Sequence, residues 1–428
     1  MGWTSHPSDR SRSVSDQLST DAGGEANEAQ PARSAALPFN VRLLSAGPFV
    51  TMVDRFAIAP LLIPIAIDMR VPIAAVAAAA TAYFIAYGLG QPIWGFLSDR
   101  FGRVRIIRAG LGIASVGCAL SALAPNVDLL IAARILTGVS VCAILPTCLV
   151  YIGDRVPFQL RHAVIADVLA AVAIGTAVGS LAAGLLAHFL TWRLMFAIPA
   201  VVGALVVYQL RRLPESSAPA PVGGPLAQLK QAVRRPWARF LILFALPEGA
   251  IVLGFLTYFA PALESTGTSA AIAGLVVAMY GVAVLVFTQI VKRFASSVPA
   301  WVPICIGGAM AIGGYLVAAL DQHLVAIFLA SVLIGGCYSF MHSTLQAWAT
   351  DIAPEVRGAA AALFVALAFT GGAIGTAFGA YLIQWSLYRQ LFLVGAALSV
   401  PVVVVAAVAR TRYKGTVLAS EASTAASS

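Results

Sequence analysis

The chain has 428 residues, of which 60% are hydrophobic and 11% charged, and its formal net charge is +9. Soluble domains carry roughly 25% charged residues, so a water-soluble fold of this composition would expose large apolar patches. The composition therefore excludes an ordinary soluble enzyme, a disordered chain and a fibrous repeat. It predicts a polytopic protein whose main solvent is lipid.

The apolar runs of the chain predict its elements in order. Residues 1–38 contain no apolar stretch long enough for a secretory signal, so we expect a disordered cytoplasmic tail there. From residue 43 onward, apolar runs recur that are each long enough to cross about 30 Å of hydrocarbon. Twelve such runs lie near residues 43–67, 73–97, 105–124, 127–152, 163–188, 191–210, 240–263, 270–291, 300–320, 324–350, 357–385 and 389–409. The sequence predicts an all-α membrane protein with twelve transmembrane helices.

A Pro-, Gly- and Ser-rich segment divides the runs into six plus six. We expect an N-terminal six-helix bundle over residues 39–210, a cytoplasmic central loop over 211–238, a C-terminal six-helix bundle over 239–410 and a disordered cytoplasmic tail over 411–428. An internal repeat, AIGTAVG at 173–179 and AIGTAFG at 373–379, indicates that the two bundles are pseudo-symmetric. Two similar halves that rock around a site at their interface are typical of a transporter.

The positions of the basic residues predict the orientation in the membrane. Of the 27 Lys and Arg residues, 22 fall in one alternating set of loops and three in the other. By the positive-inside rule, both termini and the central loop are cytoplasmic. The basic residues are scattered rather than gathered on one face, so we expect no nucleic-acid partner. The five cysteines lie inside apolar runs without metal-ligand spacing, so we expect no metal site.

One loop carries a family resemblance. GFLSDRFGRVR, at residues 95–105, resembles the G-x-L-[AS]-D-R-x-G-R-[RK] loop of the major facilitator superfamily. We expect Gly95 to let a neighbouring helix approach and Gly102 to permit a tight turn. The charged residues are expected to pair across the cytoplasmic gap between the bundles; they are Asp99, Arg100, Arg103 and Arg105, with Asp154 as a further partner. The alternative is that these arginines only set the topology.

Three charged residues inside spans are candidates for proton coupling. Asp54 lies near the centre of the first span, where a desolvated carboxylate can bind and release a proton, although a static ion pair is the alternative. Glu248 in the seventh span is a second candidate carrier. Arg134 begins RILTGVS in the fourth span, which resembles the R-x-x-x-G element of the superfamily. That resemblance implies a role in proton coupling.

Three further residues are candidates for substrate binding. Adjacent residues of a helix point about 100° apart, so Asp54 and Arg55 cannot both face one cavity, and one must neutralise a partner elsewhere. We place Arg55 in the substrate site. His342 and Gln346 are one helical turn apart in the tenth span and can bind a polar substrate group together, although a single interhelical hydrogen bond would also account for the histidine.

Glycines in the fifth and eleventh spans have two interpretations. GTAVGSLAAG, at residues 175–184, is similar to the antiporter element G-x-x-x-G-P-x-x-G-G, but lacks its proline and one glycine. The alternative is close helix packing through small residues. The residues concerned are Gly175, Gly179, Gly184, Gly375 and Gly379.

The resemblance implies a secondary transporter with alternating access, similar to the twelve-span drug:proton antiporters. We expect a proton-coupled exporter of small organic molecules or drugs, working as a monomer in the bacterial plasma (inner) membrane. The alternatives are a proton symporter that imports a sugar, an organic anion or another metabolite, and a non-transporting membrane sensor. No nucleotide-binding or nucleophile motif is present, so we expect no enzymatic activity, no catalytic residue and no cofactor. The expected partners are the substrate, protons and the lipid bilayer.

Overall fold

The computed structural model describes residues 40–216, 224–294 and 297–413. Within these residues, twelve helical segments are long and apolar enough to cross a membrane. The first six consist of α1 (Val41–Met69), α2 (Ile73–Phe101), α3 (Arg103–Leu123), α4 (Val127–Val141) with α5 (Ile144–Arg155), α6 (Phe158–Phe189) and α7 (Leu194–Gln209). The other six consist of α9 (Pro236–Gly249) with α10 (Phe259–Glu264), α11 (Ala270–Phe294), α12 (Trp301–Leu320), α13 (Leu324–Cys337) with α14 (Ser343–Asp351), α15 (Arg357–Ile383) and α16 (Tyr388–Arg412). The predicted twelve-helix fold in two six-helix bundles is confirmed.

The segment expected as a central loop also contains helices. A short 3₁₀ helix covers Leu210–Arg212, and α8 covers Pro225–Arg234. Proline at the first helical position and the strong helix formers in PLAQLKQAVR favour α8. Residues 217–223 and both predicted tails, up to 39 and from 414, lie outside the described residues.

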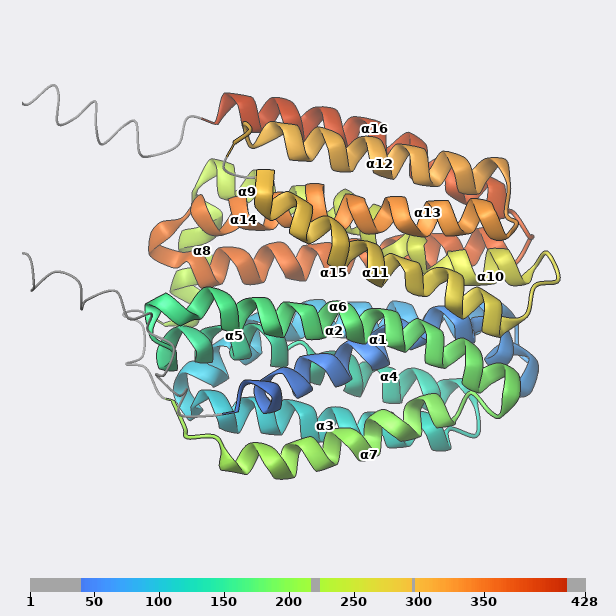
Figure 1. Cartoon of the computed structure of the whole chain (residues 1–428), viewed down its shortest axis with the longest axis horizontal. Coiled ribbons are helices and arrows are strands. Elements are labelled where there is room, and N and C mark those ends of the chain that lie inside the picture. The colour runs from blue at the N-terminus through green and yellow to red at the C-terminus, as the bar shows by residue number, and fades with distance from the viewer. Residues whose placement is uncertain (1–39, 217–223, 295–296, 414–428) are drawn as a thin grey trace, which may run out of the picture. The chain divides into compact units, whose positions relative to one another are not determined.

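The two bundles lie side by side along their helix axes, with blue-to-green helices on one side and yellow-to-red helices on the other (Figure 1). The outer edge of the N-terminal half is formed by α3 and α7. The outer edge of the C-terminal half, on the opposite side, is formed by α12 and α16. The halves meet where α2 packs along α15 and α6 packs along α11. Near one end, α1 also contacts α10.

Glycines allow this close approach between helices. A Cβ atom on Gly184 of α6 would lie 2.3 Å from the carbonyl oxygen of Ala270 in α11, which is too close for any side chain. A Cβ atom on Gly175 or Gly179 would lie 2.7 or 2.5 Å from a carbonyl oxygen of α1. In the other half, Gly375 approaches Ala250 and Gly379 approaches the Tyr258 ring. The structure thus places all five glycines at helix contacts, as small residues in membrane bundles favour.

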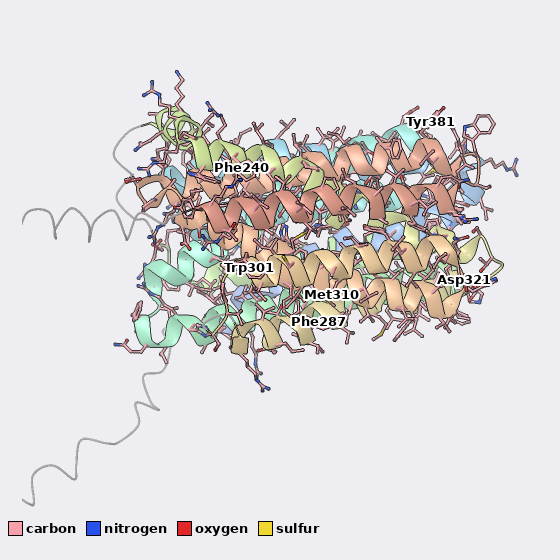
Figure 2. The ribbon with its side chains drawn as sticks, turned by 90° about the horizontal axis from the view of Figure 1, so that it is seen from above. Phe240, Phe287, Trp301, Met310, Asp321 and Tyr381 are labelled. Atoms are coloured by element: carbon pink, nitrogen blue, oxygen red, sulfur yellow. The ribbon has the colours of Figure 1, made fainter. Side chains whose placement is uncertain are left out.

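The outer surface of the bundle is apolar along its flanks. Large hydrophobic side chains such as Val286, Ile306 and Val404 are exposed there. Figure 2 shows the flank formed by α12, which runs from Trp301 past Met310 to Asp321 at one end of the bundle. Exposed apolar flanks between polar ends match the surface that a lipid bilayer covers.

Candidate functional site

The predicted proton carrier Asp54 and the predicted coupling residue Arg134 form a buried ion pair. Arg134 Nη1 donates to Asp54 Oδ1 over 2.9 Å, and the two side chains are 2% and 1% exposed. Cys118 Sγ donates to the same Asp54 oxygen over 3.3 Å. Asp54 Oδ2 and Arg134 Nε have no hydrogen-bond partner among the described residues. The pair therefore rests on one direct hydrogen bond and leaves one carboxylate oxygen free to take a proton.

Aromatic rings enclose the Arg134 guanidinium. Its central carbon lies 4.7 Å from the ring centre of Phe196 and 5.5 Å from that of Tyr83. Cation–π contacts of this kind contribute about 0.5–2 kcal/mol each when they are desolvated. The Arg134 side chain is almost fully buried, so its charge depends on Asp54 for most of its compensation.

A second pair lies in the C-terminal half, where Glu248 Oε1 and His342 Nδ1 are 2.7 Å apart. Both residues are buried, and Glu248 Oε2 has no partner in the described part of the chain. His342 Nδ1 thus makes the interhelical hydrogen bond that the sequence analysis gave as the alternative to a ligand role, and its partner is the other candidate proton carrier. Gln346 follows one turn later in α14 and is half-buried. Each half therefore holds one acid paired between its first and fourth spans.

The backbone departs from α-helical geometry beside this second pair. π-helical turns cover Ala250–Gly254, just after Glu248, and Tyr338–His342, which contains the histidine itself. A π turn inserts one residue into a helix, weakens the regular hydrogen-bond ladder and is frequent at functional sites. The Glu248–His342 pair therefore lies where both spans depart from regular α-helix.

Arg55 is placed differently from Asp54, as the 100° offset between neighbouring residues predicts. Its guanidinium carbon lies over four rings, at 4.5 Å from the Phe369 ring centre and between 5.2 and 6.0 Å from those of Phe56, Tyr87 and Phe84. Phe369 belongs to α15 of the C-terminal half, whereas Arg55 belongs to α1 of the N-terminal half. The structure therefore places Arg55 at the interface between the halves.

A small cavity connects Arg55 with Arg134. Tyr83, Phe84, Ile58 and Ala80 complete its lining. The space that is open to the centre of a water-sized sphere is about 10 Å³. That is room for one water rather than for an organic substrate.

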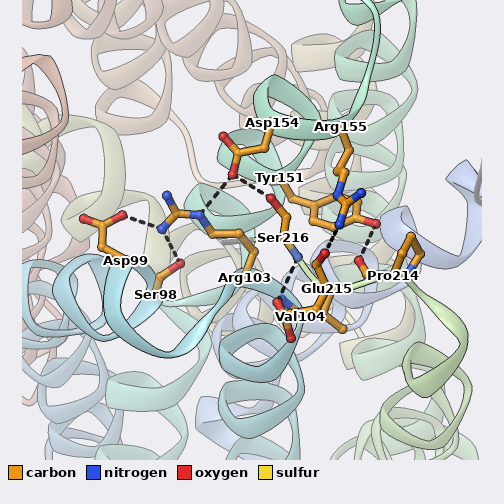
Figure 3. Close-up of polar contacts among 10 residues, drawn as sticks. All are labelled: Ser98, Asp99, Arg103, Val104, Tyr151, Asp154, Arg155, Pro214, Glu215 and Ser216. Carbon is orange, nitrogen blue, oxygen red and sulfur yellow. Dashed lines mark hydrogen bonds and ion pairs between the residues drawn. The ribbon is translucent and has the colours of Figure 1, made fainter. Parts of the chain in front are cut away.

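The loop that resembles the superfamily motif forms a polar network, shown in Figure 3. Arg103 donates to Asp99, to Ser98 Oγ over 3.1 Å and to Asp154 Oδ2 over 3.2 Å. Ser216, which follows the sixth span, donates to the same Asp154 oxygen over 3.0 Å. Asp154 is thus the further partner that the sequence suggested.

Glu215 fastens the same segment to the beginning of α3. Its carboxylate accepts a hydrogen bond from the backbone N–H of Val104 over 2.8 Å, and its backbone carbonyl accepts from Arg155 (Figure 3). The carboxylate also accepts from the backbone N–H of Arg105 over 3.1 Å. A carboxylate at this position also interacts favourably with the positive end of the α3 dipole. Gly102 has φ +98° and a Cβ there would meet Glu215 at 2.7 Å, so a glycine is required at this turn.

Two expectations about this loop are wrong. The ion pairs do not cross between the bundles: Asp99, Arg103, Arg105 and Asp154 find their partners within the N-terminal half and the segment that ends it, because residues 214–216 fold back over the turn. Gly95 lies in open space, since a Cβ atom at this position would meet nothing within 4 Å. Arg100 is exposed and contacts only the Phe101 ring among the interactions of the described residues.

Replacing Arg103 with alanine should destabilise the N-terminal half. The change removes hydrogen bonds to Asp99, Asp154 and Ser98, and leaves two partly buried carboxylates close together. We expect a loss of about 1–3 kcal/mol, measured as a lower midpoint of thermal unfolding in detergent. Arg100→Ala in the same loop is the matched control and should change the midpoint little. Equal losses in both variants would contradict this account.

Sequence reasoning missed Glu215, Ser216 and the rings around Arg55. The letters PES at 214–216 were the available signal for the first two, since a proline ends the helix and an acidic residue follows it. For the aromatic residues no signal was available, because Phe369 lies more than 300 residues from Arg55 and apolar residues fill every span.

Comparison with known proteins now places the chain in a family. The sequence profile of the Major Facilitator Superfamily matches residues 44–356 and 250–426. The chain belongs to this superfamily. As a superfamily member with twelve apolar helical segments, it is an integral membrane protein.

Relatives within the superfamily have diverse names. The chain is 37% identical over 95 residues to a triacylglyceride transporter of Mycolicibacterium hassiacum, covering 22% of this chain and 18% of the relative. It is 28% identical over 187 residues to the multidrug resistance protein MdtM of Escherichia coli O157:H7, covering 43% and 45%. It is 29% identical over 133 residues to the niacin transporter NiaP of Acinetobacter baylyi, covering 31% and 30%. The matched segments span less than half of each relative.

Solved structures of superfamily members share the fold along most of the chain. The nucleoside transporter NupG has a TM-score of 0.69 at 14% identity, covering 88% of this chain and 100% of that one. The xylose transporter XylE from E. coli, in a partially occluded inward-open conformation, has a TM-score of 0.68 at 17% identity, covering 85% and 97%. At these identities the likeness concerns the fold alone.

Proposed function

We propose that the protein is a proton-coupled secondary transporter that exports small organic molecules by alternating access. The observation that supports this proposal is the buried Asp54–Arg134 pair, in which a proton acceptor and its counter-charge join α1 to α4 away from water. Protonation of Asp54 leaves Arg134 as an uncompensated cation inside a ring of aromatic groups. The resulting cost of several kcal/mol can be relieved by moving these helices, which links proton binding to conformation.

The proposed direction of transport rests on the kinds of protein to which the chain is similar. Multidrug resistance proteins of Escherichia coli and Bacillus subtilis are among them, which favours export. The second candidate is proton symport of an imported metabolite, which is favoured by Arg55, a cation without an acidic partner at the interface of the halves. We further propose a monomer in the bacterial inner membrane with both termini cytoplasmic, in keeping with the distribution of basic residues.

The test measures proton movement and substrate flux together. The full chain is reconstituted in proteoliposomes that contain a pH-sensitive dye, and a panel of organic cations, anions and neutral solutes is added with and without a pH gradient. We expect at least one solute to move only with the gradient and to shift the internal pH. Solute flux that ignores the gradient and moves no protons would overturn the coupling.

A further inference from the structure

Arg55 is a cation whose polar edge has no partner. Near the middle of the first span, its guanidinium lies against aromatic rings and has neither a hydrogen bond nor an ion pair to any residue that the structure describes. A charged arginine at this depth is costly to insert into a membrane. Such residues persist in membrane spans where they serve a ligand or a partner, so this position needs an explanation beyond packing.

The aromatic contacts of Arg55 satisfy the faces of its guanidinium but not its N–H donors. Rings that stack on a guanidinium cover its two flat faces, whereas its five N–H donors point outward within the plane. The contacts with Phe369, Phe56, Tyr87 and Phe84 therefore offset part of the desolvation and leave the donors unused. A planar carboxylate is the acceptor that fits such a fork, through two parallel hydrogen bonds.

The charges around Arg55 are already matched to one another. Asp54, its neighbour in α1, is bonded to Arg134, and Glu248 contacts His342. Neither acid forms an ion pair with Arg55, so its guanidinium is the unpaired charge that an incoming ligand meets. An anion is attracted to this charge and a cation is repelled by it. One carboxylate supplies the single negative charge that matches one guanidinium.

The rings also define the body of the ligand and its location. Tyr87 of α2 stacks flat on Phe369 of α15, with ring centres 3.7 Å apart and planes 5° apart. Phe56 of α1 stacks on Tyr280 of α11, with ring centres 5.6 Å apart. Both stacks join the two halves beside Arg55, and both must separate when the halves move apart. The freed ring faces then offer flat apolar surfaces to a ligand.

We propose that the transported substrate is an organic monoanion with a flat aromatic or apolar body, whose carboxylate is bound by Arg55 and whose body stacks between the rings of Phe56, Tyr87, Phe369 and Tyr280. The assignment rests on the proposed transport function and specifies its substrate class. A lipophilic cation would meet Arg55 without compensation, so the class also separates this protein from carriers of cationic drugs.

The experiment uses three ligands of one shape and different charge. Binding of 2-naphthoate, 2-naphthamide and 2-naphthylmethylammonium to the purified full chain is measured by calorimetry and by the shift in thermal unfolding. We expect 2-naphthoate to bind at least tenfold more tightly than the other two. Arg55→Gln should weaken naphthoate binding by roughly ten- to a hundredfold and leave naphthamide binding unchanged, because only the charge-assisted hydrogen bonds are lost.

Two further variants keep the result interpretable. Arg55→Lys retains the charge without the planar fork, and should bind naphthoate with intermediate affinity. Arg193→Gln is the matched control, since Arg193 also lies over a ring, that of Trp192 at 4.4 Å, but pairs with Asp68. It should bind naphthoate as the unmodified protein does.

Three results would overturn the inference: no naphthoate binding, equal binding in Arg55→Gln, or tighter binding of the ammonium ligand. The proteoliposome measurement is independent of these outcomes. Proton movement driven by a cation would leave the proposed function standing and remove this substrate class. Naphthoate binding without any proton movement would support the substrate class and remove the proposed proton coupling.

Discussion

Asp54→Asn is expected to abolish proton-driven transport, and to lower stability because Arg134 keeps its charge, while the protein still folds and binds substrate. Asparagine has nearly the same shape and keeps an oxygen that can accept from Arg134 Nη1, but it cannot take up and release a proton. Flux driven by a pH gradient in proteoliposomes should fall to the level of empty vesicles. Exchange of labelled substrate across the membrane without a gradient should persist, because it needs no change of protonation.

Asp68→Asn is the matched control for this experiment. Asp68 lies in the same helix, near its end, and its half-exposed side chain pairs with Arg193 at 3.4 Å. Exposed pairs contribute about 0–1 kcal/mol, so gradient-driven flux should be close to normal. If Asp54→Asn also transports normally, Asp54 is a static partner of Arg134, and the Glu248–His342 pair becomes the remaining candidate for the proton site.

The fold could be predicted from the sequence because the bilayer imposes it. Each span must present about 20 apolar residues and satisfy its own backbone hydrogen bonds, so hydropathy alone locates the helices to within a few residues. The helix α8 was missed because it is polar and short, and a loop and a surface helix have similar hydropathy. Its proline start and helix-forming composition were the better guide.

The sequence identified the individual residues of the candidate site, but it predicted only part of the contacts between them. Any acid or arginine inside a span stands out, which singled out Asp54, Arg55, Arg134 and Glu248. Their contacts depend on helix rotation and on neighbours 80 to 94 residues away in the chain, as for Asp54 with Arg134 and Glu248 with His342. The rotation of each helix about its own axis cannot be read from a single sequence.

The charged loop shows how a motif can be recognised while its contacts are misjudged. Its arginines were expected to reach across to the other half, since opposite charges at the ends of two bundles suggest a latch. All the partners lie in one half: Asp99 is four residues from Arg103, Asp154 ends the fourth span, and Glu215 returns from the end of the sixth span to Val104. Contacts inside one bundle do not depend on how the two halves move relative to each other.

Arg134→Ala is expected to be the most destabilising single change in the N-terminal half. It leaves the Asp54 carboxylate buried at 1% exposure with only the weak Cys118 donor, and it removes the group that fills the space between Phe196 and Tyr83. Loss of one partner of a buried pair costs about 3–5 kcal/mol. We expect a much lower yield of monodisperse protein in detergent and a lower thermal unfolding midpoint. Arg105→Ala should change both little, because the Arg105 side chain is 72% exposed and pairs with Glu215 only at 3.9 Å.

A double variant separates the stability of this pair from its function. In Asp54→Asn with Arg134→Gln both charges are removed and two neutral amides of similar shape can bond to each other, so most of the lost stability should return. Gradient-driven transport should stay absent, because the proton acceptor and its counter-charge are both gone. If the double variant is no more stable than Arg134→Ala, the loss comes from packing between the two rings rather than from an uncompensated charge. Recovery of coupled transport together with stability would show instead that the pair holds α1 against α4 and that the proton is carried in the other half.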